Sequence, residues 1–418
     1  MPLPHPARVA YTLNMKLAVV SVHYPYGRNE TYLEHELTAL ARIVGPVAVY
    51  PLCATGRTTR MLPAGVELRS LSRGVELYAR AFLFALRNAP RVHAILADLL
   101  RSQSSVLTKL KNVGILARAI DLGRRLRADG VDHVHGYWLS TPATAAYVAS
   151  RLANIPWSAT AHRWDIYERN ALDLKFADAA FIRTISQRGR RDLNGFRQAG
   201  APIVCVPIGV PIPTFVSRNF GPVEPLQLLC PAALVPVKGH ETLLESLALC
   251  ARHGVSVRCT LAGEGPERSR LERLAQSLGL GDSVVFAGHV EQRALHAALE
   301  KGAFHAVVLA SHEHPGGLME GVPAALIEAM ARAVPVIATA SGSVGELIDA
   351  TTGRLVAPGK PAELAAAIMH LQRDFSSAKK RAARGFARVV SSHDVNRQMN
   401  VLAGLLASPS SYVERTSA

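Results

Sequence analysis

Cysteine is scarce in this sequence, and the few cysteines are not arranged in pairs. Five occur among 418 residues, an odd number, and no two have Cys-x-x-Cys spacing. A disulfide framework or a structural zinc site needs paired or clustered thiols. The cysteines therefore argue against both kinds of site and indicate reduced thiols in a cytoplasmic protein.

Long apolar runs are also missing. No stretch approaches the roughly 20 apolar residues that a membrane-spanning helix requires. The opening residues, MPLPHPARVAYTLN, lack the apolar core of a secretory signal. We therefore expect a cytoplasmic protein whose contact with a membrane, on the inner face of the plasma membrane, would be peripheral.

Several cofactor and nucleic-acid motifs are absent as well. The segment after the apolar run 16–22 does not fit the G-x-G-x-x-G dinucleotide fingerprint, so NAD is not expected. Basic and aromatic residues are not interleaved in the manner of single-strand binders, so nucleic acid is not expected as a partner. No Asp-x-Asp pair offers carboxylates to a divalent ion, so we expect neither a metal nor a cofactor.

Positive charge, in contrast, is abundant and unevenly placed. Residues 1–215 contain 27 Lys and Arg against 14 Asp and Glu, whereas residues 216–418 contain 20 against 18. A basic N-terminal half attracts anionic lipid or a lipid-diphosphate acceptor. We therefore expect contact with an anionic membrane surface to involve this half.

One segment of the basic half is both apolar and rich in arginine. Residues 75–100, VELYARAFLFALRNAPRVHAILADLL, have the composition of an interfacial helix. The same pattern also fits a helical layer that packs on a sheet with its arginines in water. The sequence leaves both interpretations open.

The most informative stretch runs from Val307 to Leu347. Its apolar runs 307–310 and 334–338 predict two buried strands, and a polar, Gly-rich loop and a helix lie between them. Pro323 suits the first helical position, and Leu326, Ile327 and Met330 give the helix an apolar face. The N-terminus of such a helix attracts phosphate.

Two carboxylates flank that helix end. Glu320 precedes the helix and Glu328 lies inside it. Because a carboxylate accepts two hydroxyl hydrogen bonds at once, each suits a vicinal diol of a ribose or a hexose. A phosphate site between two such carboxylates fits a nucleotide-sugar. The alternative is a surface helix whose glutamates are merely solvated.

These residues carry a family resemblance. Glu320-Gly321-Val322-Pro323, followed by Glu328-Ala329-Met330-Ala331, resembles the E-x7-E signature of retaining glycosyltransferases of family 4, which have the GT-B fold. Within that family, the sequence most resembles the bacterial exopolysaccharide and colanic-acid type. The resemblance implies that Glu328 binds the ribose, while Glu320 and the amides of Gly321 and Val322 face the donor sugar and diphosphate.

Further segments match the same family in order. Lys238-Gly239 resembles its phosphate-binding Lys-Gly, Gly263-x-Gly265-Pro266 its tight turn, and the segment ending in His289 and Val290 its base-reading strand. The implied donor-binding residues are thus Lys238, Gly239, Gly263, Gly265, His289, Val290, Gly321, Val322, Pro323, Leu326 and Glu328. One departure is Ala233, where the family commonly has an arginine of the phosphate clamp.

The N-terminal half has similar matches. Asn29-Glu30-Thr31-Tyr32 resembles the family's first loop, and Thr160 to Asp165 resembles its T-A-H-x-x-D segment, whose His lies beside the donor's anomeric carbon. The resemblance implies His162, Glu320 and Lys238 as catalytic residues. It also implies that residues of the acceptor site or of the loop at the reaction centre are Gly27, Asn29, Glu30, His135 and Asp165.

The resemblance covers nearly the whole chain and implies its architecture. We expect an α/β protein of GT-B type, two Rossmann-like domains with parallel sheets facing across a cleft. Residues 1–210 would bind the acceptor, residues 211–385 the nucleotide-sugar, and a helix in 386–418 would pack back on the first domain, followed by a tail. Five prolines between residues 207 and 225 indicate the linker.

The implied function is transfer of a hexose, with retention and without metal. The donor would be a UDP- or GDP-sugar and the acceptor a glycan or lipid-linked glycan of surface polysaccharide biosynthesis. Two alternatives stay open: a nucleotide-binding scaffold subunit of weak activity, suggested by Ala233, and a nucleotide-sugar epimerase or phosphorylase of the same architecture.

Overall fold

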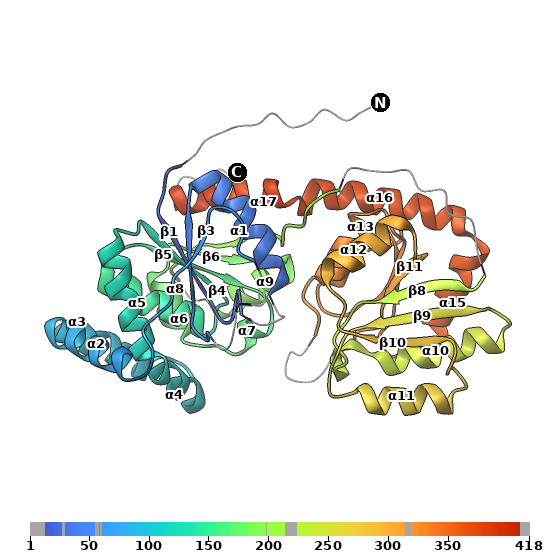
Figure 1. The fold of residues 1–418 in the computed structure, drawn as a ribbon, viewed down its shortest axis with the longest axis horizontal. Coiled ribbons are helices and arrows are strands. Elements are labelled where there is room, and N and C mark those ends of the chain that lie inside the picture. Colours follow the sequence, from blue (N-terminus) through green and yellow to red (C-terminus); the bar gives the residue numbers. More distant parts are fainter. Residues whose placement is uncertain are drawn as a thin grey trace. The chain divides into compact units, whose positions relative to one another are not determined.

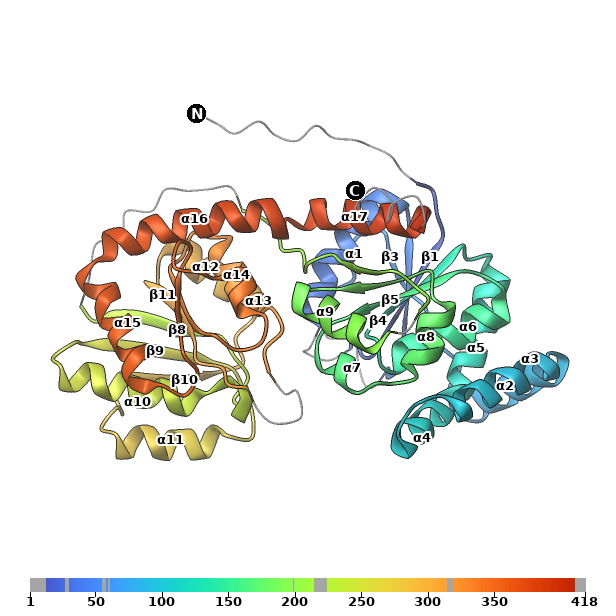
Figure 2. The same ribbon diagram turned by 180° about the vertical axis from the view of Figure 1, so that it is seen from behind.

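Strands and helices alternate along the chain, and the strands gather into two separate sheets (Figures 1 and 2). The computed structural model describes residues 13–26, 30–54, 58, 61–197, 199–213, 224–313 and 319–409. As far as these residues go, one unit covers Met1–Ile185, Gly189–Gly209 and Val395–Ala418, and the other covers Ser186–Arg188 and Val210–Asp394. Both sheets are parallel in every described pairing, which confirms the predicted α/β fold class.

The first unit is built on a seven-stranded sheet of order β3-β2-β1-β4-β5-β6-β7. Its strands are short and mostly buried, because helices cover both of their faces, and β4, β5 and β6 contain buried polar side chains. Their bounds are β1 Leu17–Ser21, β2 Val47–Pro51, β3 Val66–Leu68, β4 His133–Tyr137, β5 Trp157–Ala161, β6 Phe181–Thr184 and β7 Ile203–Cys205. The apolar run 16–22 of the sequence contains β1, whereas β3 has only three residues.

Helices cover the two faces of this sheet and enclose one apolar core on each. One core contains residues of α5 and α6, and the other contains residues of α1 and α17, among them the fully buried Leu33, Leu37, Met399 and Leu402. The bounds are α1 Thr31–Val44, α2 Gly74–Arg87, α3 Ala89–Arg101, α4 Val106–Gly114, α5 Leu116–Asp129, α6 Thr141–Ala153, α7 Trp164–Tyr167, α8 Leu172–Asp178, α9 Gln187–Phe196 and α17 Val395–Ala407.

A buried ion pair joins α1 to β6 in the layer beneath α17. Both guanidinium ends of Arg183 donate to the carboxylate of Glu36, at 2.7 and 2.8 Å, and both side chains are buried. Arg183 also donates to the carbonyl of Val206 at 2.9 Å, and Glu36 accepts the amide of Gly209 at 3.1 Å. The pair therefore fixes the segment that follows β7 as well as the helix.

The second unit repeats the first on a smaller scale, with the strand order β10-β9-β8-β11-β12-β13. Its strands are β8 Leu226–Cys230, β9 Val257–Ala262, β10 Val284–Gly288, β11 Ala306–Leu309, β12 Val336–Thr339 and β13 Arg354–Val356. Its helices are the 3-10 turn η1 Pro236–Lys238, α10 His240–Arg252, α11 Arg268–Ser277, α12 Gln292–Lys301, α13 Ala324–Met330, α14 Val344–Leu347, α15 Pro361–Arg373 and α16 Phe375–His393.

The predicted boundary at residue 386 is wrong. It lies inside α16, which belongs to the second unit, whereas the return to the first unit begins at Val395. The long helical pattern at the end of the chain is two helices, since Asp394 between them has extended backbone (φ −62°, ψ 123°). Residues 214–223 of the expected linker lie outside the described part of the chain.

No helix among the described residues is both long and apolar enough to cross a bilayer.

Candidate active site

Both sheets have the same topological switch point. β1 lies between β2 and β4, and β8 lies between β9 and β11. The order of the strands in each sheet therefore reverses direction at β1 and at β8. In open parallel sheets, ligands bind outside the carboxyl ends of the strands at this point. The loops that follow β8 and β11, and those that follow β1 and β4, are therefore the candidate positions for a site.

In the second unit, the two loops at the switch point meet through an ion pair. Lys238, after β8, donates from Nζ to Oε1 of Glu320, after β11. The hydroxyl of Ser311 donates to the same oxygen at 2.8 Å, and Glu320 is buried. The structure thus brings together two residues that the sequence predicted to be catalytic, and it adds Ser311, which the sequence did not single out.

The backbone packs tightly around this pair. Gly239 has φ +64°, and a Cβ there would overlap the carbonyl oxygen of Ala310, so only glycine fits. The amide of His312 donates to the carbonyl of Val237 at 2.9 Å, which joins the two loops. Beside them is a pocket of 280 Å³, whose lining includes His240 and Arg270. A small, partly polar hollow therefore adjoins the loop on which Lys238 lies.

The helix after this loop is shorter than predicted. α13 begins at Ala324, and Pro323 is the residue before it, with extended backbone (φ −66°, ψ 118°). Gly321 and Val322 lie in the preceding turn, with Val322 buried. Leu326 is buried as well, and its amide donates to the carbonyl of Pro323 at 3.0 Å. Leu326 therefore packs the core, and its part in donor binding stays a prediction.

Glu328, on α13, is held by the neighbouring helix α12. Gln292 donates to its Oε1 at 2.5 Å, and Nε2 of His296 lies 3.0 Å from its Oε2. Its side chain is partly buried, with 16% of its surface exposed. The carboxylate is thus fixed in place by two residues that the sequence did not identify, and it keeps an edge open to solvent.

The remaining predicted donor residues lie at the carboxyl ends of β9 and β10. A Cβ at Gly263 would overlap the carbonyl oxygen of Ala232, and one at Gly265 would overlap that of Leu234. Both glycines therefore allow their turn to pack against the loop that leads to Lys238. His289 is more exposed: its Nε2 lies 3.2 Å from Glu291, and Val290 follows it.

In the first unit, the switch point also holds a carboxylate bonded across two loops. Trp138, after β4, donates from its indole N–H to Glu30, after β1, at 2.7 Å. The other oxygen of Glu30 accepts the amides of His23 and Tyr24 at 3.2 and 2.9 Å. Glu30 and Trp138 both have positive φ, +64° and +135°. Such conformations are costly for non-glycine residues and cluster at functional sites.

His162 follows β5, and its ring packs on Trp138 and Tyr32. Its ring centroid lies 4.1 Å from that of Trp138 and 5.1 Å from that of Tyr32. Its Nδ1 lies 3.9 Å from Oδ2 of Asp165. Trp164 also packs against Trp138, with ring centroids 5.3 Å apart. Glu30, His162 and Asp165 are thus brought together, and the three aromatic residues around them were not predicted.

Asp165 fixes the turn that carries His162. Its carboxylate accepts the amides of His162 at 3.0 Å, Arg163 at 2.7 Å and Leu139 at 2.9 Å. Burial acts to raise the pKa of Asp165, but the His162 ring and these amides outweigh it, so the pKa lies below its ordinary value. Asp165 is therefore an ionised positioning residue for the histidine.

His135 does not lie in this group, contrary to the prediction. It is fully buried within the sheet, where Nδ1 lies 2.7 Å from the hydroxyl of Ser158 and Nε2 lies 2.8 Å from that of Thr160. His133 shares Ser158 from the same face of β4, at 2.8 Å. Burial lowers the pKa of His133 to about 3 and that of His135 well below its ordinary value. We assign His135 a neutral packing role.

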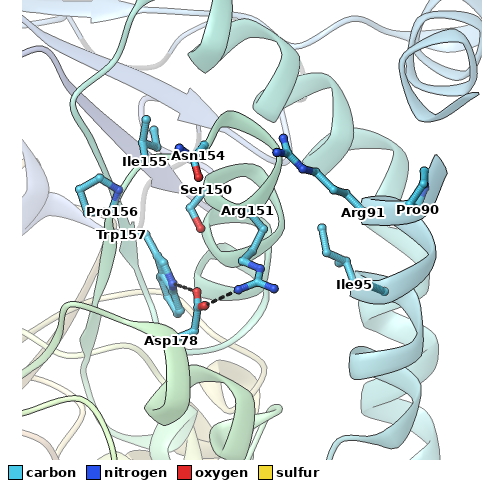
Figure 3. A pocket seen from close by; sticks show the side chains of 11 residues that line it. Pro90, Arg91, Ile95, Ser150, Arg151, Asn154, Ile155, Pro156, Trp157 and Asp178 are labelled. Carbon is cyan, nitrogen blue, oxygen red and sulfur yellow. Dashed lines mark hydrogen bonds and ion pairs between the residues drawn. The ribbon is translucent and has the colours of Figure 1, made fainter. Parts of the chain in front are cut away.

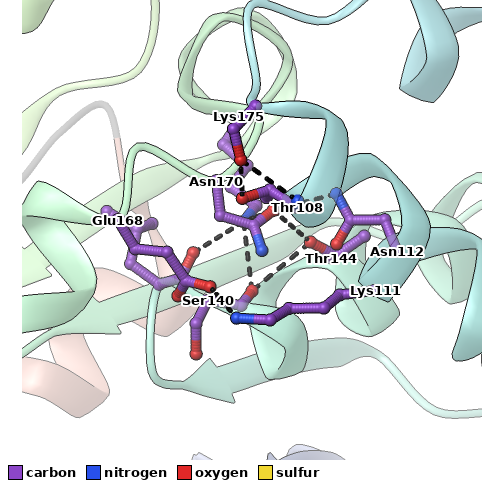
Figure 4. Close-up of polar contacts among 10 residues, drawn as sticks. Thr108, Lys111, Asn112, Ser140, Thr144, Glu168, Asn170 and Lys175 are labelled. Carbon is purple, nitrogen blue, oxygen red and sulfur yellow. Dashed lines mark hydrogen bonds and ion pairs between the residues drawn. The ribbon is translucent and has the colours of Figure 1, made fainter.

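A buried lysine, which the sequence did not predict, supports the loop that carries Trp138. Lys175 on α8 donates to the carbonyls of Leu139 and Ser140 at 2.6 and 3.1 Å and to Oδ1 of Asn170 at 3.2 Å (Figure 4). Leu139 follows Trp138 and also donates its amide to Asp165. Through Leu139, Lys175 therefore supports both Trp138 and Asp165, which contact His162. Burial lowers the pKa of Lys175 to about 7.

The protonation of Lys175 predicts a pH dependence of stability. Between pH about 7 and 10.5 the unfolded chain binds a proton that the native chain lacks, so unfolding becomes harder as pH rises. We expect Lys175→Met to remove a slope of up to about 1.4 kcal/mol per pH unit in that window. Urea unfolding of both proteins, followed by tryptophan fluorescence, measures it; Lys109→Met, a partly exposed lysine, is the control. Parallel pH profiles for wild type and Lys175→Met would contradict this assignment.

A pocket of 680 Å³ lies between α3 and α6, at the opposite ends of the strands of the first sheet (Figure 3). Asp178 accepts from Arg151 at 3.0 Å and from the indole of Trp157 at 2.9 Å. Because Trp157 is the first residue of β5, the pocket adjoins the amino ends of the strands. It is therefore separate from the residues described above.

Two predicted residues, Gly27 and Asn29, lie outside the described part of the chain. Within the described ranges, no group of three or more His, Cys, Asp or Glu side chains is placed to hold a metal ion.

The chain matches known proteins in its second unit and in its fold. Residues 214–387 match the family model described as Glycosyl transferases group 1. The chain is 32% identical over 207 residues to WcaL of Escherichia coli K12, whose name describes it as a colanic acid biosynthesis glycosyltransferase. The match covers 48% of this chain and 49% of WcaL. The chain is also 25% identical over 402 residues to a glycogen synthase of Mycobacterium tuberculosis, covering 91% of each. The chain thus spans about half the length of the first of these relatives.

Two solved structures resemble the whole fold. Alr3699/HepE of Anabaena, solved in complex with UDP-glucose, has a TM-score of 0.70 at 18% identity and covers 94% of this chain and 100% of its own. The sucrose-phosphate synthase tll1590 of Thermosynechococcus elongatus also has a TM-score of 0.70, at 20% identity, covering 94% and 99%. At these identities the likeness concerns the fold, and it confirms the predicted class of two Rossmann-like α/β domains of GT-B type.

Proposed function

We propose that this chain, whose residues 214–387 form a Glycosyl transferases group 1 domain, transfers a hexose from a nucleotide-sugar to a glycan or lipid-linked glycan. The observation that carries the proposal is the ion pair of Lys238 with Glu320 at the switch point of the second sheet. A partly exposed cation and a buried carboxylate at that point suit a diphosphate and a sugar hydroxyl respectively.

The donor class has further support. Alr3699/HepE, which shares the fold, is described as a complex with UDP-glucose. In this chain, Glu328 offers a carboxylate held by Gln292 and His296, which suits the two hydroxyls of a ribose. We therefore assign Glu328 to the ribose, Lys238 to the diphosphate and Glu320 to the transferred sugar.

The proposed chemistry proceeds with retention and without a metal. The bond from the anomeric carbon to the diphosphate oxygen breaks, and the diphosphate leaves with the electron pair. The acceptor hydroxyl attacks the same face of the sugar and gives up its proton to the leaving diphosphate. Lys238 stabilises the negative charge that grows on the diphosphate, and its bond to Glu320 must yield as it does so.

The first unit supplies His162 to this reaction. Its ring is held between Trp138 and Tyr32 and is positioned by Asp165. We assign it to the face of the transferred sugar, with Glu30 close to the acceptor. The colanic acid relative, WcaL, supports an acceptor from surface polysaccharide synthesis, and we propose peripheral action at the inner face of the plasma membrane.

Calorimetry with a panel of UDP- and GDP-sugars tests the proposal. We expect one of them to bind and Glu328→Gln to weaken that binding by about 10- to 100-fold, because hydrogen bonds to a charged group are worth about 1.5–3 kcal/mol. Glu300→Gln, which alters another carboxylate of the α12–α13 region, is the control. Absence of binding by every nucleotide-sugar would remove the proposal.

A scaffold that binds nucleotide without turnover is the second candidate. It is favoured by Ala233, an exposed residue on the loop that bears Lys238, because the family resemblance implies an arginine at that position. Turnover of the bound donor with an acceptor distinguishes the two. Conversion of the donor without an acceptor would instead indicate an epimerase.

A further inference from the structure

Helix α2 exposes an apolar stripe. Val75, Tyr78, Phe82, Leu83 and Leu86 recur at helical spacing along one side of it, and Val75 and Phe82 are 86% and 63% exposed. Its opposite side, with Leu77 and Ala81, is buried against the unit. Contiguous exposed apolar surface of this kind marks an interaction site in soluble proteins.

Helix α4 has its polar side turned inward and its apolar side outward. Thr108 and Asn112, one turn apart, are buried, whereas Val106 and Leu110 are 75% and 63% exposed, as are Leu107 and Val113 in large part. A helix that packed for burial alone would have the reverse orientation. The exposure of its apolar side is therefore built into the fold.

Specific hydrogen bonds hold α4 in this orientation. Asn112 donates to Asn170 at 3.0 Å, and Asn170 is the acceptor that Lys175 and Thr144 share (Figure 4). Lys111 forms an ion pair with Glu168 at 3.2 Å. Because Asn112 is fully buried, turning the helix over would leave its amide without these partners.

The three helices form a layer with a strong positive charge. α2, α3 and α4 lie together beyond α5 and α6, at the periphery of the first unit (Figures 1 and 2). Residues 73–118 contain eight Lys and Arg against two Asp and Glu. Exposed apolar side chains flanked by cations match the acyl boundary and anionic headgroups of a bilayer. Two copies of this face would repel each other.

We propose that the outer face of α2 and α4, defined by Val75, Tyr78, Phe82, Leu83 and Leu86 together with Val106, Leu107, Leu110 and Val113, docks this protein on an anionic phospholipid bilayer. The apolar side chains enter the headgroup boundary, and Arg73, Arg87 and their basic neighbours contact the headgroups. The argument rests on the geometry of these helices and stands apart from the assignment of the donor site.

Sedimentation with lipid vesicles tests docking of the full chain. We expect binding to vesicles of equal parts phosphatidylglycerol and phosphatidylcholine, weaker binding to phosphatidylcholine alone, and loss of binding as salt rises. The double variant Phe82→Ser, Leu110→Ser should bind at least about tenfold more weakly, since two large apolar groups are lost. Arg73→Gln with Arg87→Gln should weaken binding about fivefold per charge on the anionic vesicles alone.

Matched controls make the result specific. Met61→Ser changes a side chain of the first unit that is 89% exposed but lies outside the outer face, and Arg258→Gln removes a charge of the second unit; both should bind as the wild type does. Equal binding by all variants, or no binding by the wild type, would overturn the proposal. So would a dimer that Phe82→Ser dissociates, because the occupant would then be a second copy. Calorimetry on the same variants should show unchanged nucleotide binding, which separates a failure of docking from a failure of the proposed transferase.

Discussion

Replacing Lys238 by Gln is expected to lower kcat by about 100- to 1,000-fold, the usual effect of removing one electrostatic stabiliser of a transition state. Negative charge grows on the departing diphosphate, and Lys238 is the cation that the structure places in the loop after β8, at the switch point. Position 233 on the same loop is alanine, so no second cation at that position helps Lys238 to stabilise the diphosphate. Gln is chosen because it can still donate to Glu320.

Initial rates at saturating donor and acceptor measure this effect. The expected loss is in kcat, with a smaller change in donor affinity, since charge on the diphosphate is greatest in the transition state. Lys301→Gln alters an exposed lysine of α12 in the same unit and should leave kcat unchanged. A Lys238→Gln enzyme that retained most of its kcat would remove Lys238 from the mechanism and leave its bond to Glu320 as a structural contact.

Replacing Arg183 by Met is expected to lower the free energy of unfolding of the first unit by about 3–5 kcal/mol, because it leaves a buried carboxylate without its partner. Glu36 and Arg183 are both buried, and Arg183 donates two hydrogen bonds to the carboxylate of Glu36. Adding Glu36→Leu to Arg183→Met should restore much of the loss, since the unpaired charge is then gone. Arg69→Met breaks the exposed pair with Glu67 and should cost no more than about 1 kcal/mol.

Urea unfolding followed by tryptophan fluorescence isolates this effect, because all three tryptophans, Trp138, Trp157 and Trp164, lie in the first unit. A pH series adds a second test. Burial raises the pKa of Glu36, but Arg183 and the Gly209 amide outweigh it and lower the pKa below its ordinary 4.5. The stability that Glu36 contributes is therefore present above pH 4.5 and lost as pH falls toward the lowered value. An Arg183→Met variant as stable as the wild type at neutral pH would contradict the assignment.

The fold followed closely from local patterns. The apolar runs 307–310 and 334–338 coincide with β11 (Ala306–Leu309) and β12 (Val336–Thr339) to within two residues, because a buried parallel strand is a short apolar run. Where local signals compete, prediction was less exact. β3 has too few residues to be recognised, and Pro323 fits both the position before a helix and its first turn. His135 was expected near the reaction centre, but it is the middle residue of β4 and its neighbours across the sheet bury it.

What the sequence by itself determined is the class of the protein: two α/β halves, one carboxylate before a short helix and another inside it, and an excess of positive charge in the first half. Only the tertiary structure decided which groups meet. Lys238 and Glu320 are 82 residues apart, Glu30 and Trp138 are 108 apart, and Glu36 and Arg183 are 147 apart. The orientation of α4, with Asn112 inward, was also settled there. The reason is that local periodicity records which side of an element is apolar, whereas strand order and register, set by the packing of the whole unit, determine which side chains share an edge of the sheet.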